Sequence, residues 1–218
     1  MTPLAYPLVC FDLDGTLVDD TIYIWKTLHE TFQTDPAARK TAHGDYFAGR
    51  ISYKEWFDHD LRLLKAAGAT RQRIEAILDG LSPMNGAHEL LTELKSRGHR
   101  LAVISGSLDI VVHRLFDPSV FDYVLVNRLF FDESGRIAGG EHTPYDLDGK
   151  AEGLRALAAK EGLSLSQTAF VGDNENDIWV ARAAGLSIAF NCKSDALRSI
   201  CDEEVTEKDL RKLGSIIC

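Results

Sequence analysis

Four short polar clusters in this sequence carry side chains that could do chemistry. The first contains Asp12 and Asp14, which follow the apolar run 8–11 and precede a glycine. Two residues of extended chain place the two carboxylates on the same side, a few ångströms apart. Carboxylates at that separation repel each other, so the pair favours a bound cation, a proton or both. Because chemistry in an open parallel sheet lies at the carboxyl ends of strands, this position is typical of an active site.

Two further clusters are suited to binding an anion. Ser105 and Gly106 come directly after an apolar strand and at the expected start of a helix, where backbone N–H groups favour negative charge. Lys150 lies in the first turn of another helix, where its charge opposes the helix dipole unless an anion is bound nearby. Each cluster alone has a simpler explanation, as a helix cap or a solvated lysine.

The fourth cluster supplies two more carboxylates, Asp173 and Asp177, with Asn176 between them. It also follows an apolar strand, so these acids would meet Asp12 and Asp14 at one edge of the sheet. Oxygen ligands suit a hard divalent cation, and Mg²⁺ binds through one or two carboxylates together with substrate phosphate. Because all four polar clusters follow a strand or begin a helix, they favour one combined metal and phosphate site over four separate helix caps.

The apolar patterns around these clusters predict an α/β fold with a doubly wound parallel-sheet, Rossmann-like core. From residue 83 onward, short apolar strands alternate with helices of about a dozen residues. A hairpin turn is expected at 132–135. Strands are predicted at 8–11, 101–104, 123–126, 168–171 and 187–190, and helices at 86–97, 108–116, 149–161 and 178–184.

Residues 20–82 follow a different pattern and predict a small helical cap domain inserted after the first strand. Apolar residues recur at helical spacing until Pro36 stops the run, and further helices are expected at 52–67 and 70–78. No strand is predicted in this stretch. Such an insertion would lie over the carboxyl ends of the strands, as a lid does. The predicted domains are 1–19 with 83–218 as the catalytic core, and 20–82 as the cap.

The composition argues against several classes of protein. The 24 Lys and Arg residues against 33 Asp and Glu give a net charge of −9, which disfavours a nucleic-acid partner. No segment has the apolar length of a membrane helix, and the first residues lack the pattern of a signal peptide. The four cysteines show no paired spacing. We therefore expect a cytoplasmic protein with neither nucleic acid nor membrane as partner; the oligomeric state has no signal in the sequence.

The four clusters, in this order and over most of the chain, resemble the motifs of the haloacid dehalogenase (HAD)-like hydrolases, and within them the phosphoserine phosphatase-like branch. Residues 12–18, 103–107, 150 and 172–177 are similar to the first to fourth motifs. The resemblance implies a HAD-like core and a Mg²⁺-dependent phosphomonoesterase. It would hydrolyse a small phosphorylated metabolite through an aspartyl-phosphate intermediate.

The resemblance also implies a role for each acid. Asp12 would be the nucleophile that attacks phosphorus. Asp14 would protonate the leaving alkoxide and then take a proton from the hydrolytic water. Mg²⁺ would be held by Asp12, the carbonyl of Asp14 and Asp173, with Asp177 in the outer shell.

The remaining motif residues would bind phosphate. Ser105, Gly106 and Lys150 would hold the phosphoryl oxygens, and Asn176 would orient the nucleophile or the phosphate. This agrees with the electrostatics, because four acids can accept a phosphate dianion only if Mg²⁺ and a lysine offset their charge.

The expected cap departs from the phosphoserine phosphatase pattern. The substrate-binding glutamate of those enzymes aligns with Thr21, next to Asp20. Where they carry a substrate-binding arginine, this chain has Asp58 and Asp60, and Arg50 lies nearby in the sequence. If either acid faces the site, a substrate with an amine and no carboxylate is expected; otherwise both lie on a solvated helix face.

Three other functions remain open from the sequence. The chain could be a phosphoserine phosphatase itself, or a phosphomutase of the same fold, which would retain the phosphate. A non-enzymatic alternative is a phospho-aspartate signalling domain, which also combines clustered aspartates with a hydroxyl and a lysine. Such a domain has no reason to carry a helical lid.

Overall fold

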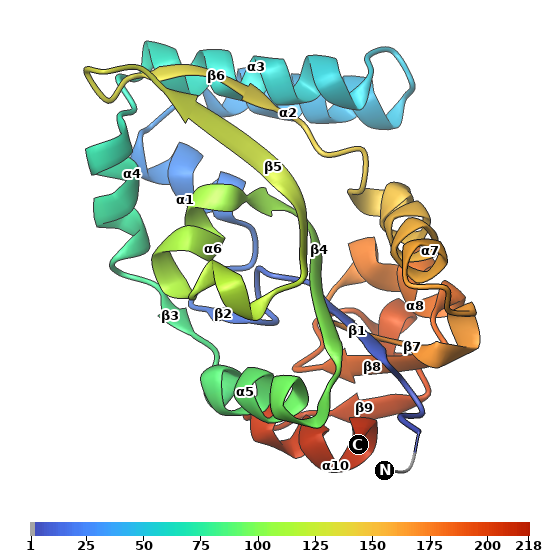
Figure 1. Ribbon diagram of the computed structural model, residues 1–218. Helices are drawn as coiled ribbons and strands as arrows, with labels where there is room; N and C mark the ends of the chain where they lie inside the picture. The colour runs from blue at the N-terminus through green and yellow to red at the C-terminus, as the bar shows by residue number, and fades with distance from the viewer. Residues whose placement is uncertain (1–2) are drawn as a thin grey trace.

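The computed structural model describes residues 3–218 as a seven-stranded sheet flanked by helices, with four more helices grouped at one end (Figure 1). The strand order is β6-β5-β4-β1-β7-β8-β9, and all neighbours are parallel except β5 and β6. The strands of this sheet are β1 (Leu8–Phe11), β4 (Arg100–Leu108), β5 (Tyr123–Phe131), β6 (Ile137–Glu141), β7 (Thr168–Gly172), β8 (Leu186–Phe190) and β9 (Glu203–Val205).

Helices cover both faces of the sheet. They are α5 (Ala87–Arg97), α6 (Asp109–Leu115), α7 (Lys150–Lys160), α8 (Ile178–Ala183), α9 (Asp195–Arg198) and α10 (Gly214–Ile217). Along β1, Leu8 and Cys10 pack in an apolar cluster with α7 and α8, whereas Val9 and Phe11 pack in another with α5 and α10. All four side chains are buried, as expected for a central parallel strand. The predicted doubly wound α/β core is confirmed.

The residues after β1 form helices, as the periodicity predicts. Ser52 and Glu55 form a reciprocal capping box at the start of α3, and Thr70 caps α4. Pro36 is a correction: it does not only end the first run but is the first residue of α2, where a missing N–H costs nothing. The helices are α1 (Ile24–Thr31), α2 (Pro36–Phe47), α3 (Tyr53–Ala66) and α4 (Arg71–Leu78).

A short two-stranded ladder joins the two ends of this helical insertion (residues 20–82). In it, β2 (Val18–Asp19) pairs antiparallel with β3 (Ser82–Pro83). The expectation of no strand between 20 and 82 is therefore wrong at Ser82, because a two-residue strand is too short to produce a pattern of alternation. The division of the chain into core and cap domains stays a prediction.

Strand β4 is longer than the sequence predicts, and this changes the setting of Ser105. The strand was expected to end at Ile104; instead it continues to Leu108, and α6 begins at Asp109, within one residue of the predicted helix start. A shift of register against β5 occurs between Ile104 and Leu108. Ser105 and Gly106 thus lie in an irregular strand end rather than at a helix N-terminus, and such irregularities re-aim side chains at sheet rims.

The β5–β6 hairpin packs against α3 of the helical insertion (Figure 1). A Cβ atom at Gly140 of β6 would lie 2.6 Å from the Arg128 carbonyl oxygen and 2.7 Å from Cζ of Phe57. A side chain at this position would therefore separate the hairpin from the helix. At the neighbouring Gly139, a Cβ atom would meet no atom within 4 Å.

We predict that Gly140→Ala lowers the free energy of unfolding by about 1–3 kcal/mol, because overpacking forces backbone to move. Gly139→Ala is the matched control, since both substitutions change the same strand by one methyl group. Urea denaturation of the two variants measures the difference. Equal stability of the two would contradict this packing.

Candidate active site

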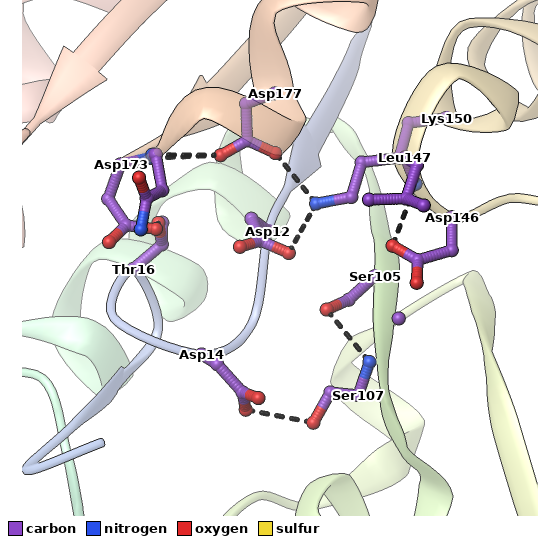
Figure 2. Close-up of polar contacts among 12 residues, drawn as sticks. Asp12, Asp14, Thr16, Ser105, Ser107, Asp146, Leu147, Lys150, Asp173 and Asp177 are labelled. Atoms are coloured by element: carbon purple, nitrogen blue, oxygen red, sulfur yellow. Dashed lines mark hydrogen bonds and ion pairs between the residues drawn. The ribbon is translucent and has the colours of Figure 1, made fainter. Parts of the chain in front are cut away.

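A fully buried ammonium group connects two of the predicted motifs. Nζ of Lys150, at the start of α7, donates to Oδ1 of Asp12 at 2.8 Å and to Oδ1 of Asp177 at 2.6 Å (Figure 2). The lysine is 0% exposed. The Asp12 backbone N–H continues the ladder between β1 and β7 by donating to the Val171 carbonyl at 2.9 Å. The fold therefore brings the ends of β1 and β7 and the start of α7 to one point.

Asp14 binds different partners from Asp12. Its carboxylate accepts from Oγ of Ser107 at 2.8 Å and from the backbone N–H of Ile24 at 2.6 Å. Burial, with a smaller contribution from the negative charge of Asp12, raises the pKa of Asp14 to about 7. A carboxyl group that titrates near neutrality can both deliver and accept a proton, which is what a general acid and base requires.

Three buried carboxylates form a candidate metal site. Asp12, Asp173 and Asp177 each offer one oxygen, and these atoms all lie within 4.8 Å of one another. Asp177 is further fixed because its Oδ2 accepts from the backbone N–H of Asp173 at 3.0 Å. The side chain of Asp14 lies outside this trio. The trio is the part of the site that could hold a metal ion.

The charges in the site fit a divalent cation. Three buried carboxylates, those of Asp12, Asp173 and Asp177, share the ammonium groups of two lysines, and the fourth, that of Asp14, pairs with neither. Burial and mutual repulsion raise the pKa of Asp173 to about 7 and that of Asp177 to about 6. An oxygen-ligated divalent ion such as Mg²⁺ would remove this repulsion.

The second lysine was missed by the sequence reasoning. Nζ of Lys193 donates to Oδ2 of Asp173 at 2.6 Å and to the Gly15 carbonyl oxygen at 3.2 Å. The residue follows β8, which is another strand whose carboxyl end reaches the same edge of the sheet. Its position after a strand was the signal that could have identified it, but it belongs to no motif.

Asn127 was missed as well. This buried amide donates to the Gly106 carbonyl at 2.6 Å and thereby holds the irregular end of β4.

A cavity of about 250 Å³ opens over the acids. Five of the predicted site residues line it, namely Asp12, Asp14, Ser105, Gly106 and Asn176. Oδ1 of Asn176 is buried without a hydrogen-bond partner. Gly106 must stay small, because a Cβ atom there would lie 2.1 Å from the Asp146 carboxylate. Lys150, which was predicted to hold a phosphoryl oxygen, does not line the cavity and instead donates to Asp12 and Asp177.

Of the five residues singled out in the helical insertion, only Asp60 lines this cavity. Asp58 and Arg50 instead form surface ion pairs with their neighbours. Asp20 is exposed, and the Thr21 hydroxyl lies 2.9 Å from that of a neighbouring threonine. The reason for the split between Asp58 and Asp60 is helix geometry, since two residues of α-helix differ by about 200° in direction.

Within residues 3–218, no helix has the length and apolar character needed to cross a bilayer.

Residues 6–185 match the family model described as haloacid dehalogenase-like hydrolase. The match covers most of the chain and includes all four motifs. The chain therefore belongs to the haloacid dehalogenase-like hydrolase family.

Within this family, the chain is similar to phosphoserine phosphatases. It is 31% identical to that of Methanocaldococcus jannaschii over 94% of this chain and 95% of that one. It is 33% identical to that of Archaeoglobus fulgidus over 96% of this chain, which spans only 59% of that longer relative. A solved phospho-aspartyl intermediate analogue of phosphoserine phosphatase superposes with a TM-score of 0.77, at 29% identity over 98% of this chain and 99% of the other. The family and these relatives indicate a phosphatase.

We predict that Lys150→Met lowers the free energy of unfolding by about 3–5 kcal/mol in EDTA, because it leaves two buried carboxylates unpaired. Lys54→Met is the control; Lys54 is an exposed lysine whose ion pair with Asp58 is worth at most about 1 kcal/mol. Chemical denaturation measures both variants. A Lys150 variant as stable as the control would contradict the bridging role.

Proposed function

We propose that this chain is a Mg²⁺-dependent phosphomonoesterase that hydrolyses a small phosphorylated metabolite through an aspartyl-phosphate at Asp12. The observation that supports it most is the position of Asp12. This carboxylate lines the cavity, belongs to the candidate metal site and binds Lys150 at 2.8 Å. A nucleophile that must meet a phosphate dianion needs such positive partners, because otherwise the two anions repel each other.

In the first half-reaction, a carboxylate oxygen of Asp12 attacks phosphorus and the bond from phosphorus to the alcohol oxygen breaks. The leaving oxygen takes a proton from Asp14, whose raised pKa makes the protonated form accessible at neutral pH. Ser107 and the Ile24 backbone N–H hold the Asp14 carboxyl in place for this transfer. The products are the free alcohol and phosphorylated Asp12.

In the second half-reaction, Asp14 is the base. It takes a proton from a water molecule, whose oxygen attacks phosphorus and releases inorganic phosphate from Asp12. Ser105, Gly106 and Asn176 line the space that the phosphoryl group would occupy and would bind its oxygens. This release of free phosphate distinguishes a phosphatase from a mutase.

Asp12 and Asp173 would hold Mg²⁺, with Asp177 beside them and the carbonyl of Asp14 as a further ligand. When bound, the ion supplies the charge neutralisation that the incoming phosphate needs. Lys193 fixes Asp173 and Lys150 fixes Asp177, so the chain itself orients the acids of the site. Preorganised charge of this kind costs no reorganisation during the reaction.

Phosphoserine is the second candidate substrate, because relatives of this chain carry that name. The helical insertion weakens this choice. Thr21 replaces the expected glutamate, and the acid Asp60 faces the cavity in the segment where an arginine was expected.

We predict that Asp12→Asn abolishes phosphate release, reducing it by a factor of about 10³ or more, because the amide cannot form the intermediate. Hydrolysis of p-nitrophenyl phosphate with Mg²⁺, followed as inorganic phosphate, measures it. Asp58→Asn, which alters an acid outside the cavity, should retain wild-type turnover. Turnover by Asp12→Asn equal to that of the Asp58 control would rule out Asp12 as nucleophile.

We also predict that Mg²⁺ at a hundredfold excess over its Kd raises the melting temperature by about 5 to 10 °C, because it binds only the folded acids. Asp173→Ala should abolish this shift, whereas Asp58→Ala should keep it. Differential scanning calorimetry without substrate measures the shift. If both variants keep the shift in melting temperature, the ion binds elsewhere.

A further inference from the structure

Aromatic rings from the helical insertion line part of this cavity. They are Trp25 of α1, Phe47 of α2, and Tyr53, Trp56 and Phe57 of α3, defined here as the aromatic wall. Their rings contact one another: Trp25 meets Phe57 edge-on at a centroid distance of 5.6 Å, and Trp56 lies 6.0 Å from Tyr53 and 6.2 Å from Phe47. Three helices thus contribute two groups of contacting rings to the cavity lining.

One ring of the wall is largely open to solvent. Phe47 lines the cavity and yet is 61% exposed. Burying a phenyl side chain is favourable by about 1.5–3 kcal/mol, so a ligand that covers Phe47 would gain from it. The exposed ring is therefore a contact surface that the fold of the chain itself does not use.

Beside the wall lies a group of polar atoms with incomplete hydrogen bonding. The buried Asp60 carboxylate has its nearest nitrogens at 3.4 Å in His59, 3.6 Å in His29 and 3.7 Å in Arg39. Nε2 of His29 and Nε of Arg39 are buried and have no hydrogen-bond partner. Buried polar groups are nearly always paired, so this group is ready to bond a polar part of a ligand.

We infer, on the basis of the proposed function, that the substrate is a phosphomonoester whose alcohol carries a planar ring with a polar edge. The phosphate lies at Asp12, the ring lies against the aromatic wall, and the polar edge meets Asp60 and Arg39. Planar rings gain from offset or edge-on contact with aromatic side chains. Because the Asp60 carboxylate accepts and the partly exposed guanidinium of Arg39 donates, the ring edge must both donate and accept.

The size of the cavity agrees with such a ligand. Its volume of about 250 Å³ lies near the lower end of the usual range for small-molecule pockets. Phosphoserine has no ring, so it would leave the aromatic wall uncovered. The helical insertion of this chain therefore selects for the alcohol part of the ester, while the sheet edge provides the phosphate chemistry.

Three phosphate esters that can make progressively more of the proposed contacts test the inference. They are ethyl phosphate without a ring, phenylethyl phosphate with an apolar ring, and imidazolylethyl phosphate with a donor and an acceptor. We expect kcat/KM to rise about tenfold or more from the first to the second, and again to the third, mainly through KM. Phosphoserine is the fourth substrate, expected to fall below both ring esters.

Two results would overturn the inference while leaving the proposed function intact. One is that the ring esters are hydrolysed no better than ethyl phosphate; the other is that phosphoserine exceeds them. Release of phosphate from none of the four esters in the presence of Mg²⁺ would overturn the proposed function and this inference together.

Matched variants assign the effect to the wall. Phe47→Leu and Trp56→Leu should lower the ratio of kcat/KM for phenylethyl over ethyl phosphate by about threefold or more. Phe130→Leu, which changes an exposed ring outside the cavity lining, should not alter it. Asp60→Asn should lower the ratio of imidazolylethyl over phenylethyl phosphate. Each ratio compares two substrates on one enzyme, so it is independent of the folded fraction; unchanged ratios in all three cavity variants would overturn the inference.

Discussion

The site depends on a single buried ammonium group held between two carboxylates. Burial alone would lower the pKa of Lys150, but the charges of Asp12 and Asp177 more than offset this and raise it. A buried charge is tolerated only when it is paired, so the lysine requires both acids and the acids require the lysine. This mutual requirement fixes helix α7 against the ends of β1 and β7. The carboxylate of Asp12, the proposed nucleophile, is thereby oriented before any substrate arrives.

The sequence predicted this edge of the sheet because each motif follows an apolar run or begins a helix. The packing of Val9 and Cys10 on opposite faces of the sheet and the convergence of the acids follow from the rules of parallel sheets. The extension of β4 to Leu108 did not follow from them. Its irregular end is held by Asn127, a contact between residues distant in the sequence. Lys193 was missed because it stands outside every motif.

In the helical insertion too, some positions can be predicted from the sequence pattern and others depend on tertiary packing. The position of Asp60 could have been predicted, since it lies on the helix face of Phe57, Leu61 and Leu64, all of which are buried. The aromatic wall could not, because its rings come from three helices whose relative placement has no local signal. The residues proposed for phosphate chemistry are thus encoded by short motifs, whereas those proposed to select the alcohol are brought together by tertiary contacts.

The central claim is that the carboxylate of Asp12, held by Lys150 and balanced by a divalent ion, carries the phosphoryl group. Trapping the enzyme with borohydride during turnover tests it directly, because reduction of an aspartyl-phosphate converts that aspartate to homoserine. The account predicts homoserine at position 12, found by peptide mass spectrometry only when both substrate and Mg²⁺ are present. Unmodified Asp12 under conditions of rapid phosphate release, or homoserine at another position, would contradict it.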